Sequence, residues 1–423
     1  MDMGNPTLSL FFLLIFLLLA SLSQQQHLKI SAVDLNALKT IKASLTDIPG
    51  STFFSTWDFT SPDPCSSFSG LTCSRISSAL RVTALSLGTG LSDSPGLAGS
   101  LSPSLSQLTE LTQLVLFPGL VTGPIPFQLG RLTTVRVISL TNNRLTGPVP
   151  TSLSALTNLH TLDLSYNQLT GSIPPSLTKL PALKVLILAS NSLSGELPPV
   201  STQLLHLDLK RNRFNGPLPL LPLSLRYLSV SQNSMRGPLN GLTSLSKLVY
   251  LDLSMNHFSG PIPAPLFKPT LSPLLLQRNN LSGGVLPVGP TRPSYGEGSV
   301  VDLSHNMLSG ELSPVLAGVE NLFLNNNHLT GKVPHEYVES VYRGSTKTLY
   351  LQHNYISGVS LGARAALPDT ASLCLSYNCM VPPSMGLTAC PASAGSQISR
   401  PAWQCSAFKN PSSKGTLGIM KSN

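Results

Sequence analysis

The chain has 423 residues, of which only 11% are charged, and its net charge at neutral pH is +9. Its 32 glycines and 36 prolines stay below the share that indicates a disordered chain. The positive charge is spread out, with no run of four or more basic residues, which argues against a nucleic-acid partner. An acidic polysaccharide or an anionic peptide fits this charge better.

The N-terminus carries a predominantly apolar run of 13 residues, from Leu8 to Ala20, followed by Ser21-Leu22-Ser23. This run is too short to span a bilayer and is typical of a signal-peptide core, with cleavage near Ser23. No basic residue precedes it, so an N-terminal anchor is the alternative. No later stretch reaches 18 apolar residues. We therefore predict a signal peptide over 1–23 and a secreted mature protein without a membrane span.

A disulfide-closed cap is predicted over 24–79. Ser31-Ala32-Val33-Asp34 resembles a helix-capping sequence, and Leu35, Leu38, Ile41 and Leu45 follow at the spacing that buries one helix face. We expect Pro49-Gly50 to end this helix. Cys65 and Cys73 stand eight positions apart, and in a secreted chain a short-range disulfide is the expected state. A zinc site is the alternative, but no histidine lies nearby.

One motif recurs over 80–378. Leu159 to Pro174 reads L-x-x-L-x-L-x-x-N-x-L-x-G-x-I-P, and the same frame stands 24 residues before and 24 residues after it. A fixed period of this length is the signature of a solenoid, in which each unit contacts only its neighbours. Thirteen units are predicted, opening at Val82, Leu111, Val135, Leu159, Leu183, Leu204, Leu225, Leu248, Leu271, Gly298, Val319, Thr346 and Thr370.

Each position of the frame has a structural meaning. The L-x-L segment predicts a short strand of a parallel sheet, with positions four and six buried and positions three, five and seven on the concave side. The asparagine at position nine, present in 11 units, can satisfy backbone groups left over where the strand turns away. The following Gly and Pro favour irregular or 3₁₀ turns on the convex side.

Two units, opening at Leu271 and Val319, are lengthened to 27 residues. They carry the segment Gly289 to Pro293 and the segment HEYVESVYRGS. Because both units keep the strand frame, we expect the extra residues to lie away from the concave sheet.

A helix, a tryptophan (Trp57) and paired cysteines in front of these repeats resemble the plant extracellular leucine-rich-repeat family. That family includes receptor-like proteins, receptor-kinase ectodomains and polygalacturonase-inhibiting proteins. The resemblance covers Asp34 to Asn378, with Phe68 in place of the family's usual second tryptophan. It implies an α/β horseshoe or superhelix with a parallel concave sheet, and a second, lateral sheet formed by the Gly-x-Ile-Pro segments.

The last unit and the following residues, 379–423, contain four cysteines: Cys374, Cys379, Cys390 and Cys405. Four cysteines permit three pairings, and we expect them to close a C-terminal cap. Cys374 occupies a strand position on the concave side, so one bond is expected to reach across that face. The polar tail from Lys409 to Asn423 is predicted to be disordered.

Aromatic and basic residues gather in the middle units. His206, Tyr227 and Tyr250 occupy position three of three consecutive units and should lie side by side. Such a surface suits sugar faces, acidic groups or a peptide carboxylate, whereas the alternative is a solvated, mildly basic sheet face. The predicted ligand-binding set, completed by the neighbouring cations, is Lys184, His206, Lys210, Arg211, Arg226, Tyr227 and Tyr250.

No catalytic residue, metal site or cofactor site is predicted. Asp163, Asp208, Asp252 and Asp302 recur at one repeat position, which a repeat consensus explains better than a glycosidase pair. The histidines occupy scattered frame positions without metal-ligand spacing. Asn280-Leu281-Ser282 is a glycosylation sequon.

Together these patterns predict a secreted leucine-rich-repeat protein, located in the apoplast or cell wall or peripherally at the plasma membrane. It would bind a protein, peptide or carbohydrate in plant signalling or defence and act through a partner receptor such as a receptor kinase. The alternatives are an inhibitor of a microbial polygalacturonase and a pectin-binding wall scaffold.

Overall fold

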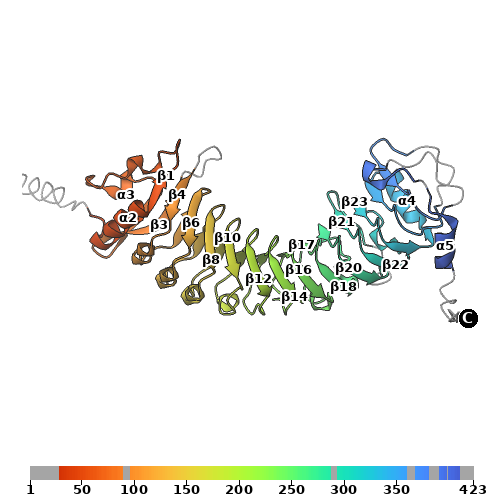
Figure 1. The fold of residues 1–423 in the computed structure, drawn as a ribbon, viewed down its shortest axis with the longest axis horizontal. Coiled ribbons are helices and arrows are strands. Elements are labelled where there is room, and N and C mark those ends of the chain that lie inside the picture. Colours follow the sequence, from red (N-terminus) through yellow and green to blue (C-terminus); the bar gives the residue numbers. More distant parts are fainter. Residues whose placement is uncertain are drawn as a thin grey trace, which may run out of the picture.

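The computed structural model describes residues 28–88, 96–286, 293–359, 367–380, 390–397 and 399–409. They form one curved stack of coils with a cap at each end (Figure 1). The signal peptide expected over 1–23, most of the segment Gly289 to Pro293, and the tail after Lys409 lie outside the described residues. Within the described residues, no helix is long and apolar enough to cross a membrane.

A sheet of fourteen strands lines the concave side. Its first pair is antiparallel and every later pair is parallel. Thirteen of the strands fall one to each predicted repeat unit. The fourteen strands are, in order, β2 (Leu71–Ile76), which precedes the repeats, and then β3 (Ala79–Leu87), β5 (Gln113–Leu116), β7 (Val137–Ser139), β9 (Thr161–Asp163), β11 (Val185–Ile187), β13 (His206–Asp208), β15 (Tyr227–Ser229), β17 (Tyr250–Asp252), β19 (Leu274–Leu275), β21 (Val300–Asp302), β23 (Asn321–Phe323), β26 (Thr348–Tyr350) and β28 (Ser372–Cys374).

A second sheet of twelve strands follows the Asn-x-Leu-x-Gly part of each coil, as the family resemblance implies. The repeated glycine sits in the left-handed region, for example Gly147 at φ 77°, where a side chain would be strained. The strands are β1 (Leu45–Asp47), β4 (Leu97–Ser100), β6 (Leu120–Pro124), β8 (Arg144–Pro148), β10 (Gln168–Gly171), β12 (Ser192–Glu196), β14 (Arg213–Gly216), β16 (Ser234–Gly237), β18 (His257–Pro261), β20 (Asn280–Gly283), β22 (Met307–Glu311) and β24 (His328–Thr330). A short pair, β25 (Lys332–Val333) and β27 (Gly358–Val359), extends it.

The convex side consists of short 3₁₀ turns, as the proline pattern predicts. They are η2 (Pro103–Gln107), η3 (Phe127–Arg131), η4 (Thr151–Ala155), η5 (Leu177–Lys179), η6 (Asn240–Leu242), η7 (Ala264–Leu266) and η8 (Pro314–Leu316). The lengthened unit from Val319 forms a helix here, α4 (His335–Tyr342), and the Tyr337 hydroxyl donates to the Ser313 carbonyl at 2.6 Å. The extra residues of that unit therefore lie away from the concave sheet.

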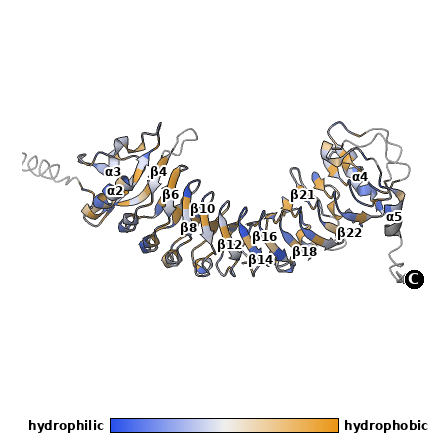
Figure 2. Cartoon of the chain, in the orientation of Figure 1, coloured by the Kyte–Doolittle hydropathy of each residue, from blue (hydrophilic) through white to orange (hydrophobic). Residues whose placement is uncertain are grey.

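One apolar core runs between the two sheets and the convex turns, and Figure 2 shows apolar residues recurring in every coil. Leu162 and Leu164, at positions four and six of the frame, are fully buried, as are their counterparts in the other units. Burying a leucine side chain contributes about 1.5–3 kcal/mol relative to leaving it exposed. The intervening strand residues are partly exposed in most units, but Asp208, Ser229 and Asp252 are buried, so the alternation of the frame holds only in part in the middle units.

The asparagine of each unit joins neighbouring coils. The Asn167 Oδ1 accepts from the Leu145 N–H of the preceding coil, and Nδ2 donates to the Leu140 and Leu164 carbonyls. The same pattern recurs at Asn143, Asn191, Asn212, Asn233, Asn256, Asn279, Asn306, Asn327, Asn354 and Asn378. Backbone groups that would be unpaired where each strand ends are thereby satisfied.

The N-terminal cap departs from the predicted capping chemistry. Helix α2 (Ala32–Ser44) begins as expected, but the Ser31 side chain makes no capping hydrogen bond. Asp34 is buried instead and accepts from Arg81 Nε at 3.0 Å and from the Val82 N–H at 2.8 Å, which joins the cap to the first repeat. The helix also ends before Pro49, because Leu45 begins a strand that pairs with β4.

The cap is closed as predicted by the Cys65–Cys73 disulfide, beside the short helices α3 (Pro64–Ser67) and η1 (Phe53–Thr56). The Trp57 indole is buried and stacks on Phe68 with 5.1 Å between ring centroids. Phe68 therefore fills its place in the aromatic cluster without the family's usual second tryptophan.

At the other end, the pairing that the spacing left open is Cys374–Cys390 and Cys379–Cys405. Cys374 stands on the concave strand β28 and bonds to Cys390, but it is fully buried and does not face solvent as its frame position predicts. Helix α5 (Ala402–Lys409) follows η9 (Ala392–Ala394), and the Arg400 guanidinium lies 4.0 Å from the Tyr355 ring centroid and 4.6 Å from that of Tyr377. The cap thus covers the last coil.

Replacing Asn256 by alanine should destabilise the stack, because Asn256 links the Met235 N–H to the Val230 and Leu253 carbonyls. We expect a loss of about 2–3 kcal/mol, since buried backbone groups are left unpaired. The denaturant midpoint measures this loss. Asn215→Ala is the matched control, because Asn215 is exposed on β14. Equal midpoints for the two variants would contradict a structural role for the asparagine row.

Candidate ligand-binding site on the concave sheet

Three aromatic rings form a continuous stack at the centre of the concave sheet. His206, Tyr227 and Tyr250 begin β13, β15 and β17 and are register partners in the parallel pairing. The His206 and Tyr227 ring centroids are 3.9 Å apart with 4° between planes, and those of Tyr227 and Tyr250 are 4.1 Å apart with 11°. The equal spacing of the coils therefore brings these three predicted residues together.

The stacking changes what the rings offer to a ligand. Each ring face between His206 and Tyr250 is covered by the next ring, so the faces that would suit a sugar ring are largely occupied. The edges, the imidazole nitrogens and the tyrosine hydroxyls remain. Tyr hydroxyls are frequent contacts in protein interfaces because they combine an apolar body with a polar tip. The stack thus favours hydrogen bonding to a ligand over stacking on it.

An ion pair between a half-buried lysine and a buried aspartate lies beside the stack. Lys210 Nζ is 3.3 Å from Asp208 Oδ2, and Asp208 is nearly inaccessible to solvent. Burial lowers the pKa of Lys210, but the charge and hydrogen bond of Asp208 outweigh it, so the Lys210 pKa stays above its usual value. Burial, together with the negative charge of Asp208, raises the pKa of Tyr227 above its usual range. Lys210 is thus cationic and Tyr227 is a neutral phenol at physiological pH.

Lys184 and Arg226 lie at the edge of the sheet where the strands begin. Backbone hydrogen bonds connect successive residues of this edge: His160 to Arg136, Lys184 to His160, Leu205 to Lys184 and Arg226 to Leu205. Arg136, His160, Lys184 and Arg226 therefore form one row, called here the basic edge. None of the four makes an ion pair among the described residues.

Arg136 and His160 extend this edge beyond the predicted set. Both residues occupy position two of their repeat units, so a comparison of that position across successive units identifies them. Arg211, in contrast, follows the end of its strand in the left-handed region (φ 55°), and its Nε donates to Gln232 Oε1 at 3.2 Å. Arg211 therefore lies on the opposite edge of the sheet from Lys184 and Arg226, and the predicted cations do not form one cluster.

The recurring aspartates have a local structural role. Oδ1 of Asp163, Asp252 and Asp302 accepts from the N–H two residues later, and Asp208 does the same toward Lys210. Each carboxylate thereby stabilises the turn that ends its strand. Among the described residues, no group of three or more His, Cys, Asp or Glu is placed to hold a metal ion. Asn280 is exposed at the start of β20, and its glycosylation stays a prediction.

Stability should depend on pH through His206. Burial lowers the His206 pKa below its ordinary value of 6.5, and the charges of Asp208 and Asp163 offset this only in part. The folded state therefore prefers neutral imidazole, so this contribution is fully present above pH 6.5 and is lost as the pH falls from 6.5 toward the folded-state pKa. His206→Gln should unfold with a shallower pH dependence than the wild type between pH 7 and 5, measured by denaturant titration. Identical slopes would contradict a neutral, buried His206.

Three comparisons relate this chain to known proteins. Family models match over 31–74 (leucine rich repeat N-terminal domain), 133–193 (leucine rich repeat) and 247–268 (leucine rich repeat). A search of curated proteins found no match.

Among solved structures, the chain is similar to the leucine-rich-repeat ectodomain of the receptor kinase GASSHO1/SCHENGEN3 from Arabidopsis thaliana, in complex with CASPARIAN STRIP INTEGRITY FACTOR 2. The identity is 28% and the TM-score 0.67 over 83% of this chain, which spans only 44% of that ectodomain. A plant ice-binding protein is also similar, with 28% identity and a TM-score of 0.54 over 80% of this chain and 100% of its own length. The repeat frame, the matched N-terminal cap and these structures show that the chain is a leucine-rich-repeat solenoid that is similar to plant extracellular leucine-rich-repeat ectodomains.

Proposed function

We propose that this chain is a secreted recognition protein whose concave sheet binds a peptide or protein ligand and which acts in plant signalling or defence through a partner receptor. The observation that carries the proposal is the in-register stack of His206, Tyr227 and Tyr250 beside the Asp208–Lys210 pair. Rigid aromatic side chains with polar tips lose little conformational entropy on binding, which suits a contact surface.

The charges around the stack suit an extended chain that carries an anionic group. The basic edge provides Arg136, Lys184 and Arg226 without acidic partners, and guanidinium groups bind carboxylates in a bidentate manner. A ligand lying across the strands would meet one side chain of each row about every 4.8 Å, the spacing of neighbouring strands. The similar ectodomain of GASSHO1/SCHENGEN3, crystallised with its bound partner, supports a binding role.

Removing the two tyrosines of the stack should reduce the amount of ligand that the protein captures. Wild-type protein, the Tyr227→Ala/Tyr250→Ala double variant and Met307→Ala would each be immobilised and incubated with plant extracellular fluid. We expect at least one peptide or protein to be retained by the wild type and about tenfold less by the double variant, since aromatic contacts at interface centres commonly contribute more than 1 kcal/mol. Quantitative mass spectrometry measures the retention.

Met307→Ala is the matched control, because Met307 is exposed on the lateral strand β22. Arg226→Ala, at an exposed position, supplies a second concave variant that leaves the stack intact. Circular dichroism melting confirms that the variants fold. The proposal fails if retained molecules are the same on all columns, or if only the lateral variant loses them.

An acidic polysaccharide is the second candidate ligand, and the basic edge favours it. Between Asp163 and Asp208 the sequence contains one acidic residue, Glu196, which stands on the lateral strand β12. We expect the protein to be retained on a pectate column and released by salt. Lys184→Ala/Arg226→Ala should elute at lower salt, whereas Arg211→Ala, on the opposite edge, should elute close to the wild type. Equal elution of all three would exclude the basic edge as a pectate site.

The inhibitor alternative predicts a different result. Purified protein would reduce pectin cleavage by a fungal polygalacturonase, measured as released reducing ends. Unchanged pectin cleavage at a saturating concentration of this protein would argue against that polygalacturonase as a partner.

A further inference from the structure

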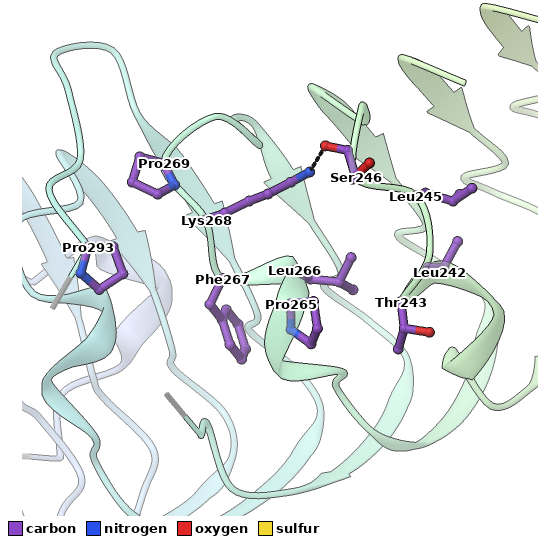
Figure 3. Close-up of a pocket in the computed structure, with 10 residues that line it drawn as sticks. All are labelled: Leu242, Thr243, Leu245, Ser246, Pro265, Leu266, Phe267, Lys268, Pro269 and Pro293. Carbon is purple, nitrogen blue, oxygen red and sulfur yellow. Dashed lines mark hydrogen bonds between the residues drawn. The ribbon is translucent and has the colours of Figure 1, made fainter. Parts of the chain in front are cut away.

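A groove on the convex side lies between the units that open at Leu225 and Leu248, which contain β15 and β17. It has a volume of about 430 Å³ and is lined mainly by leucine, phenylalanine and proline. Figure 3 shows the lining residues, with Thr243 and Leu242 on one coil facing Pro265 and Leu266 on the next. This volume falls within the range of small-molecule sites, roughly 300–1,000 Å³.

The floor of the groove is part of the folded core. Leu242, Leu245, Leu266 and Phe267 line it, and each is at most 2% exposed. These side chains are already covered by the fold, so the apolar surface open to a ligand is that of Pro265, Pro269 and Pro293 on the groove walls. Pro293, at the end of the lengthened unit, also lines the groove. The extra length of that unit therefore contributes to the groove and not to the concave sheet.

One cation stands over this apolar floor. The Lys268 side chain crosses from its own coil to the neighbouring one, where Nζ donates to the Ser246 carbonyl at 2.6 Å (Figure 3). Among the described residues Lys268 makes no ion pair. An ammonium group carries three donors, so Nζ can donate to a ligand as well.

The surroundings leave the charge of Lys268 uncompensated. Between Asp208 and Glu297 the sequence contains one acidic residue, Asp252, and it belongs to the concave strand β17. Burial lowers the pKa of Lys268, which is consistent with an ammonium partly removed from water and without an anionic partner. A carboxylate placed beside it would form a charge-assisted hydrogen bond in a partly desolvated site.

We propose that this groove binds a small amphipathic organic carboxylate, with the carboxylate paired to Lys268 and the apolar body against Pro265, Pro269 and Pro293, above the buried floor. A single cation fits a monoanion better than a phosphate or a polyanion. The proline-lined walls suit a hydrocarbon or aromatic body. This site is separate from the concave sheet, so a test of this site does not decide whether the concave sheet binds the ligand proposed there.

The test uses 2-naphthoate as the probe and its neutral amide, 2-naphthamide, as the matched comparison. Binding to the full mature protein would be measured by probe fluorescence and by ligand-observed NMR. We expect saturable binding of 2-naphthoate and about tenfold weaker binding of the amide, as for loss of one charge-assisted hydrogen bond. Lys268→Met should weaken naphthoate to the level of the amide.

Two controls locate the site. Lys247→Met removes an exposed lysine that does not line the groove, and Arg226→Ala removes a cation of the basic edge; neither should change naphthoate binding. Thr243→Phe places a large side chain at an exposed position of the groove wall and should abolish binding while Lys268 is retained. The proposal is wrong if the amide binds as well as naphthoate, if Arg226→Ala abolishes binding, or if naphthoate does not bind the wild type at millimolar concentration.

Discussion

The asparagine row is the interaction on which the rest of the molecule depends. In eleven coils one asparagine amide accepts from the preceding coil and donates to backbone carbonyls, as Asn167 does between Leu145, Leu140 and Leu164. Because leaving such backbone groups unpaired in the core would be costly, each coil is held in the same register as its neighbour. Side chains at equal frame positions therefore line up in rows across the stack.

These rows provide the recognition surface that we propose for the concave sheet. The third position brings His206, Tyr227 and Tyr250 face to face at the spacing of the strands, and the second position aligns Arg136, Lys184 and Arg226 along one edge. Neither row requires a long-range change in the backbone. Substitutions at surface positions can therefore alter the ligand while the leucine core and the asparagines keep the coil unchanged.

A solenoid exposes its core at both ends, and this chain closes each end differently. At the N-terminus, the buried Asp34 joins the cap helix to Arg81 of the first repeat. At the C-terminus, two disulfides and the Arg400 guanidinium, packed on Tyr355 and Tyr377, hold the final segment over the last coil. Both ends thus use polar or covalent links, and at the N-terminus these add to the apolar packing of Leu38, Ile41 and Trp57 on the core.

The sequence by itself determined the elements that follow from local periodicity. The leucine spacing placed the strands and the buried positions, the asparagine spacing placed the ladder, and equal frame positions placed His206, Tyr227 and Tyr250 side by side. These predictions are correct because each coil contacts only its neighbours, so residue spacing along the sequence is enough to predict which side chains lie next to each other.

Only the tertiary structure decided what depends on contacts between distant segments or on side-chain orientation. Stacking of the three rings covers their faces, which spacing alone does not reveal. Arg211 faces the edge opposite Arg226 because its backbone turns into the left-handed region, and the helix stops at Ser44 because Leu45 pairs with Gly99. The cysteine pairing and the groove under Lys268 likewise arise where separate coils meet, since no local pattern records which surfaces come together.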